Sequence, residues 1–120
     1  MKSMSQLLED SLLLIWNNRN SVERLELMEK IYSGDIVFFE NDYSEPFKGF
    51  TAINDLIDKL QLSWPESFKF TTTDFEINHN IQYVSWVLGP DAQQPVAAGK
   101  DIAIIENGKI VSLYLFLDKD

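Results

Sequence analysis

Two residues near the carboxyl end of the chain, Asn107 and Gly108, constrain the fold more than any other feature of the sequence. They separate two apolar runs of alternating pattern, residues 96–106 and 109–117. An Asn-Gly pair between such runs is the strongest short-range sign of a two-residue β-hairpin turn, because both turn positions need a left-handed backbone. The sequence therefore predicts two paired antiparallel strands over these ranges.

The predicted turn also indicates which side chains share a face of the hairpin. If pairing continues without irregularity from Glu106 opposite Lys109, then Asp101 faces Tyr114. One face then carries Gly99, Asp101, Ala103, Ile105, Ile110, Ser112, Tyr114 and Phe116. The other carries six aliphatic side chains, namely Ile102, Ile104, Val111, Leu113, Leu115 and Leu117. Neither face should be freely solvated. Helices can cover only one of them, so the aliphatic face is predicted to be the interface of a homodimer.

The amino-terminal half has the spacing of three amphipathic helices. Their predicted N-terminal caps are Ser3 (in a capping box with Gln6), Asn20 and Thr51. A short β-rich run, residues 36–39, follows the second helix and ends at Glu40. Everything after Pro65 reads as strand, and a change of parity near Thr73 predicts a β-bulge. Helices followed by an antiparallel meander predict one α+β domain over residues 1–120, with a curved and bulged sheet.

Composition narrows the classes of function. The chain has 19 acidic and 10 basic residues and a formal charge of −9, a balance that repels phosphate backbones, so nucleic acid is not an expected partner. Absent cysteines and a single histidine argue against thiolate catalysis and cysteine or histidine metal clusters, and no metal or cofactor is expected. The longest apolar run, residues 12–16, is far too short for a membrane span. Glu9 and Asp10 stand where a signal peptide would be basic, so a cytoplasmic protein is expected.

Four segments of the chain, taken in order, resemble the nuclear transport factor 2-like (NTF2-like) superfamily, and within it the SnoaL-like and ketosteroid-isomerase-like branch. They are WNNRN (16–20), IYSGDIVFF (31–39), EPFKG (45–49) and GKDIAIIENGKIVSLYLFLD (99–118). The resemblance implies a cone-shaped α+β fold in which helices close the concave face of a bent sheet. It also implies an apolar pocket between the helices and the sheet.

The resemblance further implies a pair of catalytic carboxyl groups. In ketosteroid-isomerase-like proteins a carboxylate base stands shortly before the glycine that precedes the third helix, and Glu40 occupies the corresponding position. A second carboxyl, kept protonated in an apolar site, corresponds to Asp101. The third partner in those enzymes is a tyrosine on the first helix, where this sequence has Trp16, which offers one N–H but no hydroxyl.

The residues themselves support this chemistry but leave simpler interpretations open. An apolar cavity disfavours the charged form of a carboxyl group and raises its pKa toward useful proton transfer. However, Glu40 can equally be the solvated end of a strand, and Asp101 can simply pair with Lys100 or a backbone amide. Trp16 can be core packing, and Trp86 can belong to the sheet surface or to the pocket.

Two hypotheses follow for the function. The first is an enzyme that transfers protons on a small apolar carbonyl compound, as an isomerase, cyclase or dehydratase, with Glu40 and Asp101 as catalytic residues. The pocket would be lined by Trp16, Trp86, Tyr114 and Phe116. The second is a non-catalytic module that binds a small apolar ligand or acts as a dimer. Convergence of Glu40, Asp101 and Trp16 on one cavity would favour the enzyme.

Overall fold

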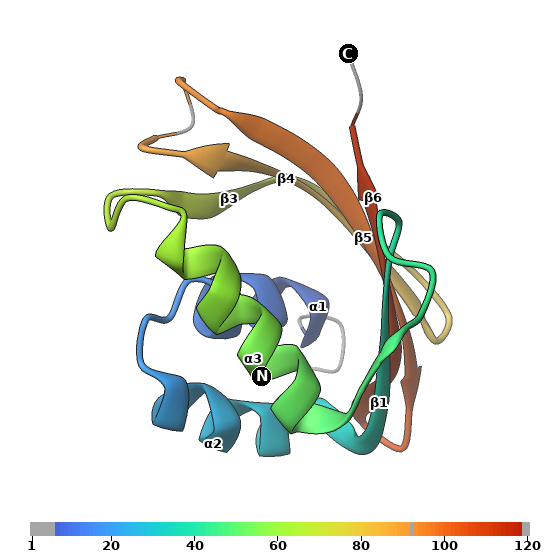
Figure 1. The fold of residues 1–120 in the computed structure, drawn as a ribbon. Coiled ribbons are helices and arrows are strands. Elements are labelled where there is room, and N and C mark those ends of the chain that lie inside the picture. Colours follow the sequence, from blue (N-terminus) through green and yellow to red (C-terminus); the bar gives the residue numbers. More distant parts are fainter. Residues whose placement is uncertain (1–6, 92, 119–120) are drawn as a thin grey trace.

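The structure, a computed structural model, describes residues 7–91 and 93–118. Its helices are α1 (Leu7–Asp10), the π-helix η2 (Ser11–Trp16), α2 (Ser21–Ile31) and α3 (Gly49–Leu62). Its strands are β1 (Tyr32–Glu40), β2 (Phe47–Lys48), β3 (Lys69–Asn78), β4 (Ile81–Gly89), β5 (Ala97–Glu106) and β6 (Lys109–Leu117). Figure 1 shows the helices together on the concave side of one strongly curved sheet. The predicted α+β architecture is confirmed.

The sheet has the strand order β2-β1-β6-β5-β4-β3, in which β1 runs parallel to β6 and every other neighbouring pair is antiparallel. The β-bulge predicted near Thr73 is present, because the β3–β4 register shifts between Thr72 and Asp74. Bulges increase the local twist and bend a strand. This irregularity therefore contributes to the curvature that opens space beneath the helices.

The observed helix ends agree in part with those predicted from the sequence. The Asn20 side chain accepts hydrogen bonds from the backbone N–H groups of Val22 and Glu23, both at 3.0 Å, as expected of the predicted cap. Helix α3 begins at Gly49 rather than after Thr51, and a φ of 85° at Gly49 is one that glycine adopts readily. The capping box predicted at Ser3 lies outside the described residues. In the described part of the chain, no helix is long and apolar enough to cross a membrane.

The hairpin turn is confirmed, but the register predicted beyond it is wrong. Asn107 and Gly108 have φ values of 52° and 78°, and Glu106 pairs with Lys109 as predicted. The register then shifts, since Ile105 pairs with Ile110 whereas Ile104 pairs with Ser112. Val111 is thus an extra residue in β6, and every later side chain of β6 changes face.

Because of this bulge, the two faces of the hairpin differ from those predicted. Asp101 pairs with Leu115 instead of Tyr114, so the later part of β6 presents leucines to the helices. Leu113 is fully buried, and Leu115 and Leu117 pack against the core. Tyr114 instead lies on the convex face and stacks on Phe39, with ring centroids 4.5 Å apart. The convex face is consequently more aromatic than the six aliphatic side chains predicted for it.

A buried polar cluster fixes helix α3 against α2 and η2. Arg24 is fully buried and donates to the Asn54 side chain at 2.6 Å and to the Gln61 side chain at 3.0 Å, and it also pairs with Asp58. Gln61 in turn donates to the backbone carbonyl of Trp16 at 3.3 Å. A buried guanidinium group is tolerated only when it is paired in this way. The cluster therefore sets the position of α3 relative to η2, the helix that bears Trp16.

Candidate functional site

A cavity of about 200 Å³ lies between the helices and the concave face of the sheet. Its aromatic walls are Trp16, Phe38, Trp64, Phe70 and Trp86. Its aliphatic walls are mainly Leu12, Leu56, Leu60, Leu88, Leu115 and Leu117. The ionisable residues that line it are Glu40 and Asp101. The structure therefore brings Glu40, Asp101, Trp16 and Trp86 to one cavity with apolar walls.

Glu40 and Asp101 lie in one row across the sheet. Glu40 of β1 pairs with Leu115 of β6, and Leu115 pairs with Asp101 of β5. Directly paired residues project to the same face, and neighbouring strands are about 4.8 Å apart, so the two Cα atoms are separated by roughly 10 Å. The two carboxyl groups thus approach the cavity from positions two strands apart, with Leu115 between them.

Asp101 is held in an apolar setting by one hydrogen bond. It is only 6% exposed, and the indole N–H of Trp86 donates to its Oδ1 atom at 3.0 Å. Burial raises the pKa of Asp101 to about 7, and the Trp86 hydrogen bond opposes this rise because it favours the charged form. Asp101 is therefore protonated in a large fraction of molecules near neutral pH.

We infer that the second oxygen of Asp101, Oδ2, is the one that reaches the cavity. Trp86 engages Oδ1, and among the described residues no buried side-chain nitrogen or oxygen lacks a hydrogen-bond partner. An Oδ2 atom sealed in the core without a partner would appear as such an exception. Since Asp101 lines the cavity, this oxygen is the one that a bound molecule would meet.

Glu40 combines both interpretations that the sequence left open. It lies at the end of β1, and its Oε1 atom accepts a hydrogen bond from the backbone N–H of Asp42 at 2.8 Å. It is also half-buried and lines the cavity. A carboxylate accepts several hydrogen bonds, so the Asp42 contact orients the group and leaves acceptor capacity for a ligand.

Trp16 contributes its ring to the cavity, but its N–H points elsewhere. The indole nitrogen of Trp16 donates to the hydroxyl of Tyr32 at 3.2 Å, and the Ser11 hydroxyl lies 2.5 Å from the same oxygen. Ser11 and Trp16 are five residues apart, and the wider turn of the π-helix η2 lets both reach one partner. Burial raises the pKa of Tyr32 to about 12, so its hydroxyl stays neutral. At the position that the resemblance assigns to the third catalytic partner, the Trp16 N–H is therefore not free to donate to a ligand.

Tyr32 and the Trp86–Asp101 contact were missed by the sequence analysis. The helical spacing of Val22, Leu25, Met28, Ile31 and Tyr32 predicts that Tyr32 belongs to the apolar stripe of the second helix, whereas it is the first residue of β1. The pairing of Trp86 with Gly99 in the β4–β5 ladder would have indicated that the indole can cross β5 toward Asp101. That pairing depends on a register that the sequence does not determine.

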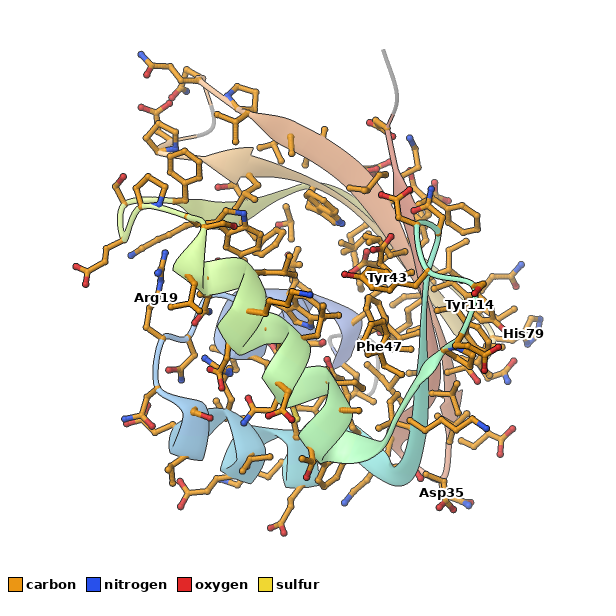
Figure 2. All side chains as sticks on the ribbon, viewed as in Figure 1. Arg19, Asp35, Tyr43, Phe47, His79 and Tyr114 are labelled. Carbon is orange, nitrogen blue, oxygen red and sulfur yellow. The ribbon has the colours of Figure 1, made fainter. Side chains whose placement is uncertain are left out.

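Two residues predicted to line the pocket do not do so. Tyr114 and Phe116 lie on the convex face, because the extra residue Val111 reverses the parity of β6, and Leu115 and Leu117 line the cavity in their place. His79 is exposed at the turn between β3 and β4, on the side of the molecule away from Arg19 (Figure 2). In the described part of the chain, no group of three or more acidic, histidine or cysteine side chains could hold a metal ion.

Comparisons with known proteins identify the fold. No protein-family model matches the chain, and no curated protein sequence matches it. Among solved structures, a proposed isomerase of the SnoaL-like family from Agrobacterium tumefaciens has a TM-score of 0.82 and 21% identity, covering 97% of this chain and 98% of that one. A proposed SnoaL-like polyketide cyclase from Jannaschia has a TM-score of 0.76 and 10% identity, covering 96% and 85%.

A third structure adds a neighbour with no assigned activity. A protein of unknown function with a cystatin-like fold from Xanthomonas campestris has a TM-score of 0.74 and 17% identity, covering 98% of this chain and 92% of that one. Similarities of this kind, over nearly whole chains, establish a shared architecture. The chain has the cystatin-like, NTF2-like α+β fold that the sequence resemblance implied.

Proposed function

We propose that this chain is a SnoaL-like pocket protein that transfers a proton at the carbon next to the carbonyl group of a small apolar compound. Such a step underlies isomerisation, cyclisation and dehydration. The observation that carries the proposal is the row formed by Glu40, Leu115 and Asp101 along one apolar cavity. Two solved structures of the same fold bear names of proposed enzymes, an isomerase and a polyketide cyclase.

The two carboxyl groups differ in environment, which suits them to different roles. Asp101 is buried and its pKa is raised to about 7, so it can donate a hydrogen bond to a carbonyl oxygen while it remains protonated. Glu40 is half-buried, and as a carboxylate it can accept the proton of the neighbouring carbon. A carbonyl oxygen and that carbon are two bonds apart, so one ligand must meet the acid and the base in the same cavity, and Glu40 and Asp101 both line it.

The cavity also limits the ligand. A volume of about 200 Å³ is below the roughly 300–1,000 Å³ typical of pockets for drug-sized molecules. Aromatic side chains form much of the wall, and Glu40 and Asp101 are the ionisable groups that line it. A small, neutral and flat carbonyl compound fits these properties best.

Deuterium exchange tests the proposed chemistry directly. The protein would be incubated in heavy water with a panel of small cyclic ketones and enones, and deuterium at the carbon next to the carbonyl would be followed by NMR. Exchange well above the buffer rate is expected for at least one compound, because proton abstraction is the step assigned to Glu40. Exchange at the buffer rate across the panel would count against catalysis.

A non-catalytic ligand-binding module is the second candidate. One observation favours it, since the Trp16 N–H is used by Tyr32 and the cavity therefore holds fewer donors for a developing oxyanion. Binding without exchange separates the two candidates. Panel compounds that perturb the NMR resonances of Asp101 and Leu115 but exchange no hydrogen would support the binding module.

We also propose that the convex face pairs with a second copy of the chain. Phe39, Tyr114, Ile102 and Tyr83 follow one another across four strands of this face, with Phe116 49% exposed beside them. These four side chains are uncharged, although the chain carries a net charge of −9. Charged residues border the row: Glu76 follows Tyr83 on β3, and Lys100, paired with Asp118, lies beside Phe116. Two copies can therefore meet on an uncharged centre, where burying large apolar side chains is worth roughly 1.5–3 kcal/mol each.

Sedimentation velocity tests the dimer. The unmodified protein is expected to sediment as a dimer at micromolar concentration, and Ile102→Lys is expected to shift it to monomer by placing a charge in the middle of the face. Val22→Lys is the matched control, because Val22 is 67% exposed on helix α2. An unmodified protein that sediments as a 13.9 kDa monomer would refute the proposal.

A further inference from the structure

Gly99 lies where the indole ring of Trp86 crosses strand β5. The two residues are direct partners in the β4–β5 ladder. A Cβ atom at position 99 would lie 2.6 Å from Cζ2 and 3.0 Å from Cη2 of Trp86, and 2.8 Å from the backbone oxygen of Phe116. Real Cβ atoms do not approach other atoms this closely. Any side chain at position 99 would therefore displace the indole ring or the backbone.

The crossing carries the indole N–H to Asp101, two residues further along β5. The N–H donates to Asp101 Oδ1 at 3.0 Å. The indole ring also meets Phe70 edge-to-face, with centroids 5.0 Å apart and an interplanar angle of 83°. The ring thus packs against both the bare backbone at Gly99 and the Phe70 ring, and these contacts restrict the direction of its N–H.

We propose that Gly99 and Trp86 are positioning residues that orient the acid O–H of Asp101 toward the ligand. An indole N–H can only donate, and the carbonyl oxygen of a protonated carboxyl group is a better acceptor than its hydroxyl oxygen, so Oδ1 takes the carbonyl role. The acid hydrogen then resides on Oδ2, the oxygen directed to the cavity. Asp101 is in this way prepared to donate to a ligand oxygen, and a ligand that presents an acceptor at this point is favoured over one that presents a donor.

The inference rests on the proposed function for the role of the ligand, but the orientation itself is a property of the free protein. It can therefore be tested without a substrate. The hydrogen bond from Trp86 lowers the pKa of Asp101, while burial raises it. Loss of the indole N–H removes the lowering contribution and keeps the apolar surroundings.

The test is an NMR titration of the Asp101 side-chain carboxyl carbon in labelled, ligand-free protein. Trp86→Phe is expected to raise the Asp101 pKa above that of the unmodified protein. Trp64→Phe is the matched control, because Trp64 lines the same cavity and forms no hydrogen bond with Asp101. An unchanged or lowered pKa in Trp86→Phe would overturn the proposal, and so would an equal rise in Trp64→Phe.

The contribution of Gly99 is tested in the same titration. Gly99→Ala is expected to shift the pKa in the same direction as Trp86→Phe, since the new Cβ displaces the indole. Gly34→Ala is the control, because a Cβ at Gly34 meets nothing within 4 Å. In the Trp86→Phe background, which lacks the outer ring atoms, Gly99→Ala should add little to the pKa shift, because the clash that remains, with the Phe116 backbone oxygen, does not involve the hydrogen-bond partner of Asp101. A full additional shift there would show that Gly99 does not act through Trp86. If Gly99→Ala does not fold, the Trp86→Phe result decides.

Discussion

Replacing Asp101 by asparagine is expected to stabilise the folded protein at and above pH 7, although it removes a residue of the candidate site. The folded-state pKa of Asp101 is about 7, against an ordinary value of 3.8. At a pH between these two pKa values, the Asp101 carboxyl group is ionised in the unfolded chain and still protonated in the folded chain. Stability therefore falls as the pH rises, by about 1.4 kcal/mol per pH unit, and levels off above the folded pKa. The full loss is roughly 4 kcal/mol.

Asparagine removes this titration and preserves the shape of the side chain. Its amide oxygen can still accept the Trp86 N–H, so the packing around position 101 is retained. The measurement is chemical denaturation of both proteins from pH 4 to 8 at one protein concentration. The stability advantage of Asp101→Asn should be near zero at pH 4, grow steadily to pH 7 and then level off.

Asp35→Asn is the control for this series. Asp35 lies on the surface at the lower edge of the view in Figure 2, away from the cavity, and it is exposed. Its replacement should change stability by a small amount that does not follow the same pH course. A stability difference for Asp101→Asn that is constant from pH 4 to 8 would mean that Asp101 titrates alike in the folded and unfolded states.

A carboxyl group that destabilises the fold at neutral pH is better explained by a role in the cavity than by packing. An aliphatic side chain at position 101 would avoid the burial penalty. Strongly perturbed ionisable groups in clefts are concentrated at functional sites. Asp101 is such a group, since it is buried, has a raised pKa and lines the cavity.

The two bulges of the sheet show how far the sequence could predict the fold. At Thr73 the apolar residues change parity, from Phe68 and Phe70 to Phe75 and Ile77, so the extra residue could be located from the pattern. At Val111 the surrounding run is apolar on both parities, and one additional residue leaves no trace in the pattern. The hairpin turn was therefore predictable, whereas the side chains of β6 that face the cavity were not.

The same limit applies to the candidate site. Glu40 and Asp101 were found through a resemblance, and both lie at the cavity because each occupies a strand position that alternation places on the concave face. Tyr114 and Phe116 were misplaced because their assignment depended on β6 parity alone. The destinations of the Trp16 and Trp86 N–H groups depend on three-dimensional packing, and no spacing in the sequence encodes them.

Replacing Glu40 by glutamine is expected to reduce any proton-exchange activity by a factor of about 10² to 10⁴, the usual contribution of a general base. A carboxamide has nearly the shape of a carboxylate but does not take up a proton under these conditions. Its oxygen can still accept the hydrogen bond from the Asp42 backbone, so the end of β1 should stay in place. The stability of the variant should therefore remain close to that of the unmodified protein.

The measurement is the initial rate of deuterium exchange into the most reactive ketone of the panel, together with the free energy of unfolding. Glu45→Gln is the matched control, because Glu45 is exposed in the connection between β1 and β2, only five residues from Glu40. It makes the same change in net charge and should retain the full rate. A normal rate in Glu40→Gln would exclude Glu40 as the base. A reduced rate accompanied by a large loss of stability would mean that Glu40 acts through the fold of the β1 end and not through proton transfer.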